Sequence, residues 1–248
     1  MMGKYLHAIC DKQPAKVAVM LLVLLSILNC NPTDMPLTSG MISSGNNQIY
    51  FRSEGSGSPL IFIHGGAVDH RMWQPQWEHF RHEHQVVVYD LRGHGQSDFV
   101  DNDRQDILDL IALMDSLKLE KITVGGLSLG AILALDFALA YPERVENLIL
   151  ISPGLVGIQE QQKSYLNAMN QLGAAFQNKD TDRAVMIMSR MTFPREYPDI
   201  AGIKSYAENA FRRFIESGNY TRIPRLAELQ PVGRLEEIEC PSLILYGA

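Results

Sequence analysis

Short apolar runs alternate with helical patterns along most of this chain, and this alternation limits the folds that the chain can adopt. The runs predict strands at residues 48–52, 59–63, 85–89, 122–125, 145–151 and 242–246. Helical patterns at 103–117 and 128–141 lie between them. Strands that are apolar throughout are typical of parallel sheets covered on both faces. We therefore expect an α/β fold with a mostly parallel sheet, helices on both faces and residues 48–52 at its edge.

The chain divides into segments of different composition. Strand patterns disappear between residues 153 and 237, where helical patterns replace them, including one at 221–228. We interpret 153–237 as a helical cap inserted into a sheet domain that spans 48–248. Residues 30–47 are polar and rich in turn-forming residues, and they predict a linker.

Residues 1–29 differ in kind from the rest of the chain. Lysines precede an apolar run at 17–28, which is short for a membrane span but has the length of a signal-peptide core. Cys30 follows this run directly and resembles the lipid-attachment site of bacterial lipoproteins, although Asn29 departs from the small residue usual there. Lipid attachment at Cys30, an uncleaved anchor and cleavage further along the chain remain open. We expect export to a bacterial periplasm or attachment to the membrane as a lipoprotein.

Charge and cysteine content exclude some classes of partner and of stabilisation. The net charge is −6, and the sequence contains no cluster of lysine and arginine residues. We therefore expect no nucleic-acid partner. Of three cysteines only Cys240 lies in the sheet domain, so an internal disulfide is excluded there. We expect Cys240 to be a small buried apolar residue.

The segment Gly126-Leu127-Ser128-Leu129-Gly130 follows one predicted strand directly and precedes a predicted helix. A sharp turn from strand to helix lifts a serine hydroxyl clear of the sheet, and only small flanking residues tolerate the crowding there. The alternative is a serine that caps the helix beside packing glycines. The position between strand and helix favours Ser128 as a nucleophile.

A second glycine-rich turn, His64-Gly65-Gly66-Ala67, follows the predicted strand at 59–63. Acyl transfer creates a tetrahedral oxyanion, which two preorganised backbone N–H groups stabilise. We predict the N–H groups of Gly66 and Leu129 as these donors. Asp69 and His70 come just after this turn; they would either contact a substrate or, as we favour, belong to a solvated loop.

Two further segments carry a resemblance to a known family. The run at 89–98, Tyr-Asp-Leu-Arg-Gly-His-Gly-Gln-Ser-Asp, follows a strand, and Tyr-Pro-Glu-Arg-Val at 141–145 follows a helix. With the two glycine-rich turns they resemble the α/β-hydrolase superfamily with an inserted cap. The stretch from Met72-Trp73 to residue 95 is similar to the branch of carboxylesterases, enol-lactonases and cofactor-free haloperoxidases. The resemblance implies Ser128 as nucleophile, Gly66 and Leu129 as oxyanion donors, and His64 as a support of its loop rather than a base.

The family also places an acid after the strand that corresponds to 242–246, and a histidine after one further strand. The chain ends at Ala248, before both positions. We therefore expect a truncated sequence that lacks the last strand and helix of the fold. Since a serine hydroxyl needs a base, such a chain should be nearly inactive.

The function that follows is a serine hydrolase that cleaves a small ester or lactone through an acyl-serine intermediate, without a cofactor. A serine in place of a carboxylate argues against epoxide hydrolases and haloalkane dehalogenases, while peracid formation and carbon–carbon cleavage remain open. The alternative is a non-catalytic binding protein for a small molecule, with the same fold. His79, His82 and His84 have no partner ligands at zinc-like spacing, so we expect no metal site.

Overall fold

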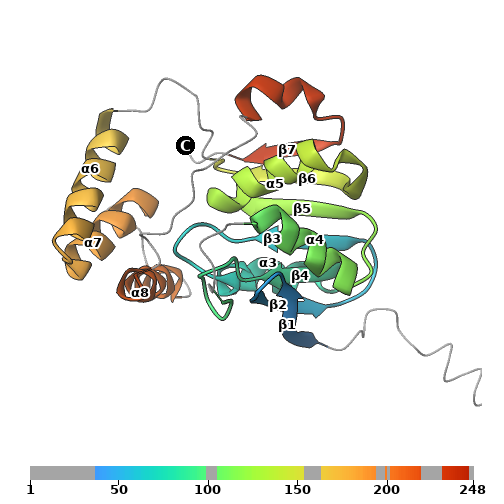
Figure 1. Cartoon of the computed structure of the whole chain (residues 1–248), viewed down its shortest axis with the longest axis horizontal. Coiled ribbons are helices and arrows are strands. Elements are labelled where there is room, and N and C mark those ends of the chain that lie inside the picture. The colour runs from blue at the N-terminus through green and yellow to red at the C-terminus, as the bar shows by residue number, and fades with distance from the viewer. Residues whose placement is uncertain are drawn as a thin grey trace, which may run out of the picture.

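The computed structural model describes residues 37–98, 105–153, 163–193, 199, 202–218 and 231–245. These residues form a seven-stranded sheet in the order β1-β2-β4-β3-β5-β6-β7 (Figure 1). The strands are β1 (Thr38–Ser44), β2 (Asn47–Glu54), β3 (Pro59–Ile63), β4 (Gln85–Tyr89), β5 (Ile122–Leu127), β6 (Val145–Ile151) and β7 (Ser242–Leu245). β2 pairs antiparallel with β1 and with β4, and the other neighbours are parallel. The expected α/β fold with a mostly parallel sheet is confirmed.

The edge of the sheet corrects one expectation. Residues 38–44 lie in the segment 30–47 that we predicted as a linker, yet they form β1 and a hairpin with β2. β2 is therefore an inner strand and not the edge. Only Ile42 and Ser44 of β1 are buried, so this edge strand needs few apolar residues. Because it consists largely of Thr, Ser and Gly, its sequence does not have the apolar pattern that predicts a strand.

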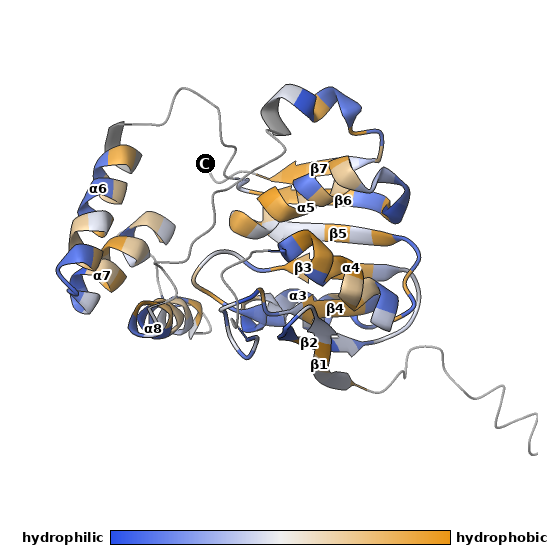
Figure 2. Cartoon of the chain, viewed as in Figure 1, coloured by the Kyte–Doolittle hydropathy of each residue, from blue (hydrophilic) through white to orange (hydrophobic). Residues whose placement is uncertain are grey.

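Alternate side chains of the strands fill two separate cores, one on each face of the sheet. The helices on the two faces are α4 (Asp106–Ser116), α5 (Leu129–Ala140), α3 (Gln74–Phe80) and the 3-10 helix η1 (His70–Trp73). Ile61 and Ile63 of β3 belong to the core beneath α4 and α5. Phe62 faces the other way and packs with Trp73 and Trp77 of η1 and α3. Figure 2 shows hydrophobic residues along the inner strand β3 and along β6 and β7.

The helical cap forms a third apolar cluster beside the sheet. Its helices are α6 (Lys163–Gln177), α7 (Thr181–Thr192) and α8 (Ile203–Glu216), which contact one another in sequence (Figure 1). Ala67, from the turn after β3, belongs to the same cluster. The 3-10 helix η5 (Pro231–Glu237) instead contacts α5, so the end of the predicted cap range packs on the sheet domain.

Several expectations fall outside the described residues. These are the signal segment 1–29, Cys30, the helix predicted at 221–228 and the start of the helix predicted at 103–117. Cys240 is partly buried against the core beneath α4 and α5. Among the residues that the structure describes, no helix is long and apolar enough to cross a membrane.

Candidate active site

Ser128 lies in a strained turn between β5 and α5. Its backbone has φ 51° and ψ −109°, a region that non-glycine residues rarely adopt, and its side chain is exposed. A methyl group on Gly126 would come within 2.2 Å of the Gly130 carbonyl, and one on Gly130 within 2.2 Å of the Ile63 carbonyl oxygen. Both glycines are therefore required by backbone contacts, as the strand-to-helix turn predicts.

The two predicted oxyanion donors lie close together. A methyl group on Gly66 would contact Leu129 at 3.7 Å from Cδ2 and 3.9 Å from Cβ, so the turn after β3 meets the start of α5. No hydrogen bond within the described part of the chain occupies the backbone N–H of Gly66 or of Leu129. The first N–H groups of a helix have no partner within it and favour negative charge.

His64 supports the turn after β3. It is fully buried, its Nδ1 lies 2.7 Å from the Gly65 carbonyl oxygen, and the Leu91 N–H donates to Nε2 across 2.9 Å. Nε2 therefore accepts and Nδ1 carries the proton, which describes a neutral ring. Burial lowers the pKa of His64 below its ordinary value, which favours the same form. With both nitrogens engaged, this ring cannot take the proton of Ser128.

Asp90, which directly follows β4, holds two loops together. Its Oδ1 accepts from the backbone N–H of His70 at 2.8 Å and lies 2.8 Å from the His70 ring Nδ1. Its Oδ2 accepts from the Gln96 N–H at 2.9 Å. Gly95 has φ 51°, and a methyl group there would strike the Asp90 carboxylate. Asp90 thus ties the loop after β3 to the loop after β4, and neither Asp90 nor His70 hydrogen-bonds to Ser128.

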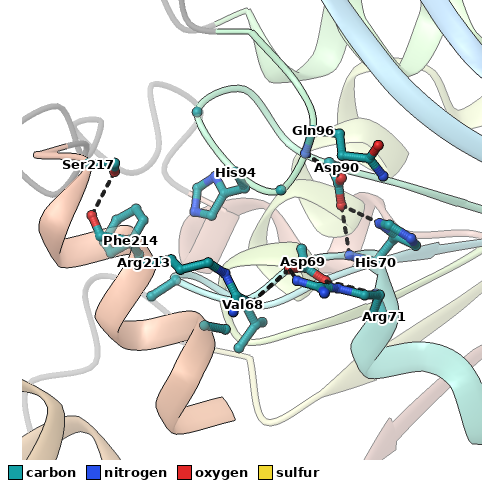
Figure 3. Close-up of a pocket in the computed structure, with 14 residues that line it drawn as sticks. Val68, Asp69, His70, Arg71, Asp90, His94, Gln96, Arg213, Phe214 and Ser217 are labelled. Atoms are coloured by element: carbon teal, nitrogen blue, oxygen red, sulfur yellow. Dashed lines mark hydrogen bonds and ion pairs between the residues drawn. The ribbon is translucent and has the colours of Figure 1, made fainter. Parts of the chain in front are cut away.

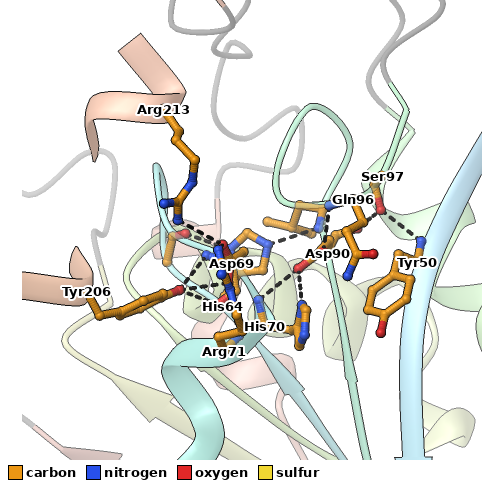
Figure 4. A network of polar contacts seen from close by, with 12 residues as sticks. Tyr50, His64, Asp69, His70, Arg71, Asp90, Gln96, Ser97, Tyr206 and Arg213 are labelled. Atoms are coloured by element: carbon orange, nitrogen blue, oxygen red, sulfur yellow. Dashed lines mark hydrogen bonds and ion pairs between the residues drawn. The ribbon is translucent and has the colours of Figure 1, made fainter. Parts of the chain in front are cut away.

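Asp69 joins the turn after β3 to the cap (Figure 4). Its carboxylate accepts from the Arg71 backbone N–H and from Nε and Nη2 of the same residue, and the Tyr206 hydroxyl donates to Oδ1 at 2.8 Å. Arg213 Nη2 lies 3.7 Å from Oδ2. Burial by itself raises the pKa of Asp69, but the hydrogen bonds from Arg71 and Tyr206 outweigh it and hold that pKa well below its ordinary value.

The expectation of a solvated loop at Asp69 and His70 is wrong. Both side chains are buried, because Tyr206 and Arg213 of α8 cover the first and Asp90 binds the second. Sequence reasoning missed Tyr206 and Arg213. They lie more than 130 residues from Asp69, and on an amphipathic helix nothing local distinguishes them from other polar residues.

One group of side chains has the spacing of metal ligands. Single ligand atoms of Asp69, His70 and Asp90 all lie within 4.8 Å of one another. The oxygens of both carboxylates are occupied by Arg71, Tyr206, His70 and Gln96, so a cation would have to displace these donors. The chemistry of this group is that of an internal ion-pair network.

A pocket of about 370 Å³ opens between this network and the cap (Figure 3). Residues 67–71, Asp90, residues 93–96 and one face of α8 line it. Its wall includes Ala67, which directly follows Gly66, whereas Ser128 does not line it. The pocket is therefore adjacent to the predicted oxyanion turn and lies under the cap.

The amino-acid sequence is similar to those of known hydrolytic enzymes. The chain is 26% identical over 212 residues to (E)-2-((N-methylformamido)methylene)succinate hydrolase of Acinetobacter baylyi, which covers 82% of this chain and 77% of that protein. It is 40% identical over 78 residues to 3-oxoadipate enol-lactonase 1 of the same organism. That match covers 31% of this chain, and the chain thus spans only 29% of the length of the enol-lactonase.

The fold has close counterparts among solved structures. An esterase from Thermogutta terrifontis superposes with a TM-score of 0.64 at 24% identity, covering 85% of this chain and 80% of the esterase. Residues 58–248 also match the family described as the alpha/beta hydrolase fold. The strained serine turn, the sheet order and these matches together establish that the chain belongs to the α/β-hydrolase family.

Proposed function

We propose that this protein is a serine hydrolase that cleaves a small ester or lactone through an acyl-serine intermediate. The observation that supports it most directly is the exposed Ser128 in its strained turn, next to which a methyl group on Gly66 would contact the Leu129 side chain. Neither backbone N–H, of Gly66 or of Leu129, is hydrogen-bonded within the described part of the chain. Of the two relatives compared by sequence above, one is a hydrolase by name and the other an enol-lactonase.

In the proposed reaction the Ser128 oxygen attacks the carbonyl carbon and its proton leaves to a base. The oxyanion forms between the two N–H groups; the carbon–oxygen bond to the alcohol then breaks, and the protonated base returns its proton to the departing alcohol. Water hydrolyses the acyl-serine in a second, equivalent step and releases the acid. No cofactor enters these steps.

The Ser128 hydroxyl has no hydrogen-bond partner among the described residues, and His64 cannot act on it. Because a serine hydroxyl is a weak nucleophile without a base, the test should not depend on ester turnover alone. The proposal is therefore best tested with a reagent whose reactivity compensates for a weak base.

The test is reaction of the purified chain with a fluorophosphonate, in which the serine oxygen bonds to phosphorus and fluoride leaves. We expect the adduct on Ser128 in a peptide mass map and its loss in Ser128→Ala. Ser152→Ala is the control, since Ser152 is also exposed, directly follows the neighbouring strand β6 and has φ 43°. A folded chain without adduct on Ser128 would contradict the proposal and favour a non-catalytic small-molecule binding protein.

We further propose that residues 1–29 direct export and that Cys30 is a site of lipid attachment, on the sequence pattern alone. Expression in a bacterium with mass analysis of the mature N-terminus tests both points. A lipid-modified Cys30 that disappears in Cys30→Ser supports attachment. A mature chain that still begins at Met1 in the cytoplasmic fraction would contradict export.

A further inference from the structure

The pocket beside the turn after β3 offers a site for more than an ester group. It begins at Ala67, whose Cα is about 3.8 Å from that of the predicted donor Gly66. Its far side is α8, from which Arg213 reaches toward Asp69 (Figure 3). A substrate with its carbonyl at Gly66 can therefore extend into the pocket toward Arg213.

The negative charges around the pocket are hidden. The side chains of Asp69 and Asp90 are 4% and 0% exposed. The oxygens of Asp69 are held by Arg71 and Tyr206, and those of Asp90 by His70 and the Gln96 N–H. Buried carboxylates with donors on both oxygens present little negative surface to a ligand.

The positive charge of Arg213, by contrast, is open to the pocket. Its side chain is 53% exposed, and its Nη2 lies 3.7 Å from Asp69 Oδ2, which is an ion pair but beyond a hydrogen bond. Arg71 already supplies the fork that neutralises Asp69, with contacts from Nε and Nη2. The guanidinium of Arg213 is therefore a second positive charge beside Asp69, whose charge Arg71 already neutralises.

The wall next to Arg213 includes two stacked aromatic rings. The rings of Phe214 and His94 stack with their centroids 5.1 Å apart and an angle of 18° between planes. The His94 Nδ1 lies 2.9 Å from the Arg92 carbonyl oxygen, which fixes the ring in place. A short carbon chain can pack along this wall while a charged end meets the guanidinium.

We propose that Arg213 recognises a carboxylate on the substrate, so that the esters or lactones for this site are those that also carry a free carboxylate. The inference rests on the proposed function for the ester or lactone group of the substrate, and on the pocket for the carboxylate of the substrate. The planar guanidinium can donate two parallel hydrogen bonds to a carboxylate, which a neutral ester cannot match.

The test compares monomethyl adipate with dimethyl adipate, which differ by one free carboxylate, in calorimetric titrations of the chain. We expect the monoester to bind at least about tenfold more tightly, as expected for hydrogen bonds to a charged group. Arg213→Met should abolish this preference without weakening the diester. Arg213→Lys, which keeps the charge but not the fork, should retain part of it.

The matched control is Arg212→Met on the same helix. Arg212 pairs with Asp182 of α7 at 2.7 Å and does not line the pocket, so its loss should leave the preference for the monoester unchanged. Thermal unfolding of both variants tests whether the protein with its altered α8 stays folded. Equal binding of the two esters, no binding of the monoester, or an equal loss in Arg212→Met would overturn the inference.

The result is separable from that of the proposed function, because binding does not need a reactive serine. If the monoester binds through Arg213 while Ser128 forms no fluorophosphonate adduct, the pocket recognises carboxylates but hydrolysis fails. If the adduct forms and the two esters bind alike, hydrolysis stands and the carboxylate class is wrong.

Discussion

The hydroxyl of Tyr206 in α8 donates to Oδ1 of Asp69 across 2.8 Å, and the two residues are 137 positions apart in the chain. The same hydroxyl lies 3.2 Å from the backbone N–H and from the carbonyl oxygen of Asp69. The Arg71 guanidinium lies 5.5 Å from the centre of the Tyr206 ring. One side chain of the cap is thus attached at several points to the turn that holds Gly66.

Tyr206→Phe should lower the free energy of unfolding by about 1.5–3 kcal/mol, because a buried ionised carboxylate loses one of its donors. Chemical denaturation at pH 7 measures the effect, since the low pKa of Asp69 keeps it charged there. Tyr141→Phe is the control: that ring stacks on Phe137, and its hydroxyl has no hydrogen-bond partner in the described part of the chain. Equal costs for both variants would show that the contact between cap and turn contributes nothing.

A buried ion pair stabilises the loop after β4. Arg92 and Asp109 are each 1% exposed, and Nε and Nη2 of the arginine contact the two carboxylate oxygens at 2.6 and 2.7 Å. Arg92→Met should cost about 3–5 kcal/mol, because it leaves Asp109 buried without its cation. The double variant Arg92→Met with Asp109→Leu should cost less than the sum of the single changes.

The comparison for this pair is an exposed one. Lys121 and Glu146 lie 3.3 Å apart with side chains 49% and 60% exposed, so Lys121→Met should change stability by less than about 1 kcal/mol. Urea titrations of the four variants measure the coupling. Strict additivity of the two buried changes would mean that Arg92 and Asp109 act independently.

The glycine at the start of α5 cannot accept a side chain. In Gly130→Ala the new methyl group would lie 2.2 Å from the Ile63 carbonyl oxygen, which belongs to the backbone of β3 and cannot rotate away. We expect a loss of about 3 kcal/mol and no fluorophosphonate adduct on Ser128. Gly173→Ala in α6 has no heavy atom within 4 Å of the new methyl group and should stabilise the protein by about 0.5–1 kcal/mol. Similar thermal shifts in the two variants would refute the packing argument.

Asp136 in α5 should make stability depend on pH. Burial raises its pKa to about 6, although Arg234 partly opposes this, and its Oδ1 has no hydrogen-bond partner among the described residues. The unfolded carboxyl has a pKa of about 3.9, so between about pH 4 and pH 6 the native state holds more protons than the unfolded state. Stability should therefore fall as the pH rises through this range.

Asp136→Asn removes the titrating charge and should flatten this dependence. A two-unit shift corresponds to about 3 kcal/mol, and partial exposure of the site reduces the expected gain at pH 7 to about 1 kcal/mol. Thermal unfolding between pH 4 and pH 7 measures it. Asp115→Asn, at a side chain that is 62% exposed, should leave the slope intact. An unchanged slope in Asp136→Asn would assign the pH dependence to other groups.

The sequence predicted the elements whose cause is local. Three expected strands, 59–63, 85–89 and 145–151, agree with the structure at both ends, because strands covered on both faces are mostly apolar along their length. The turn at Ser128 was predictable for a similar reason. Its glycines are required by backbone contacts, that of Gly126 within the turn and that of Gly130 with the neighbouring strand β3, and the glycine pattern is visible directly in the sequence.

Tertiary structure decided what depends on partners distant in the chain. β1 is a strand because β2 offers it an edge, and its own polar residues give no strand signal. Asp69 is buried because α8 places Tyr206 and Arg213 over it, and the pocket exists between segments that no local pattern joins. The periodicity of apolar residues in a sequence indicates which face of a helix or strand is buried, but not which side chains cover that face. In this protein the contacts between α8 and the turn after β3 form only when the cap packs on the sheet domain.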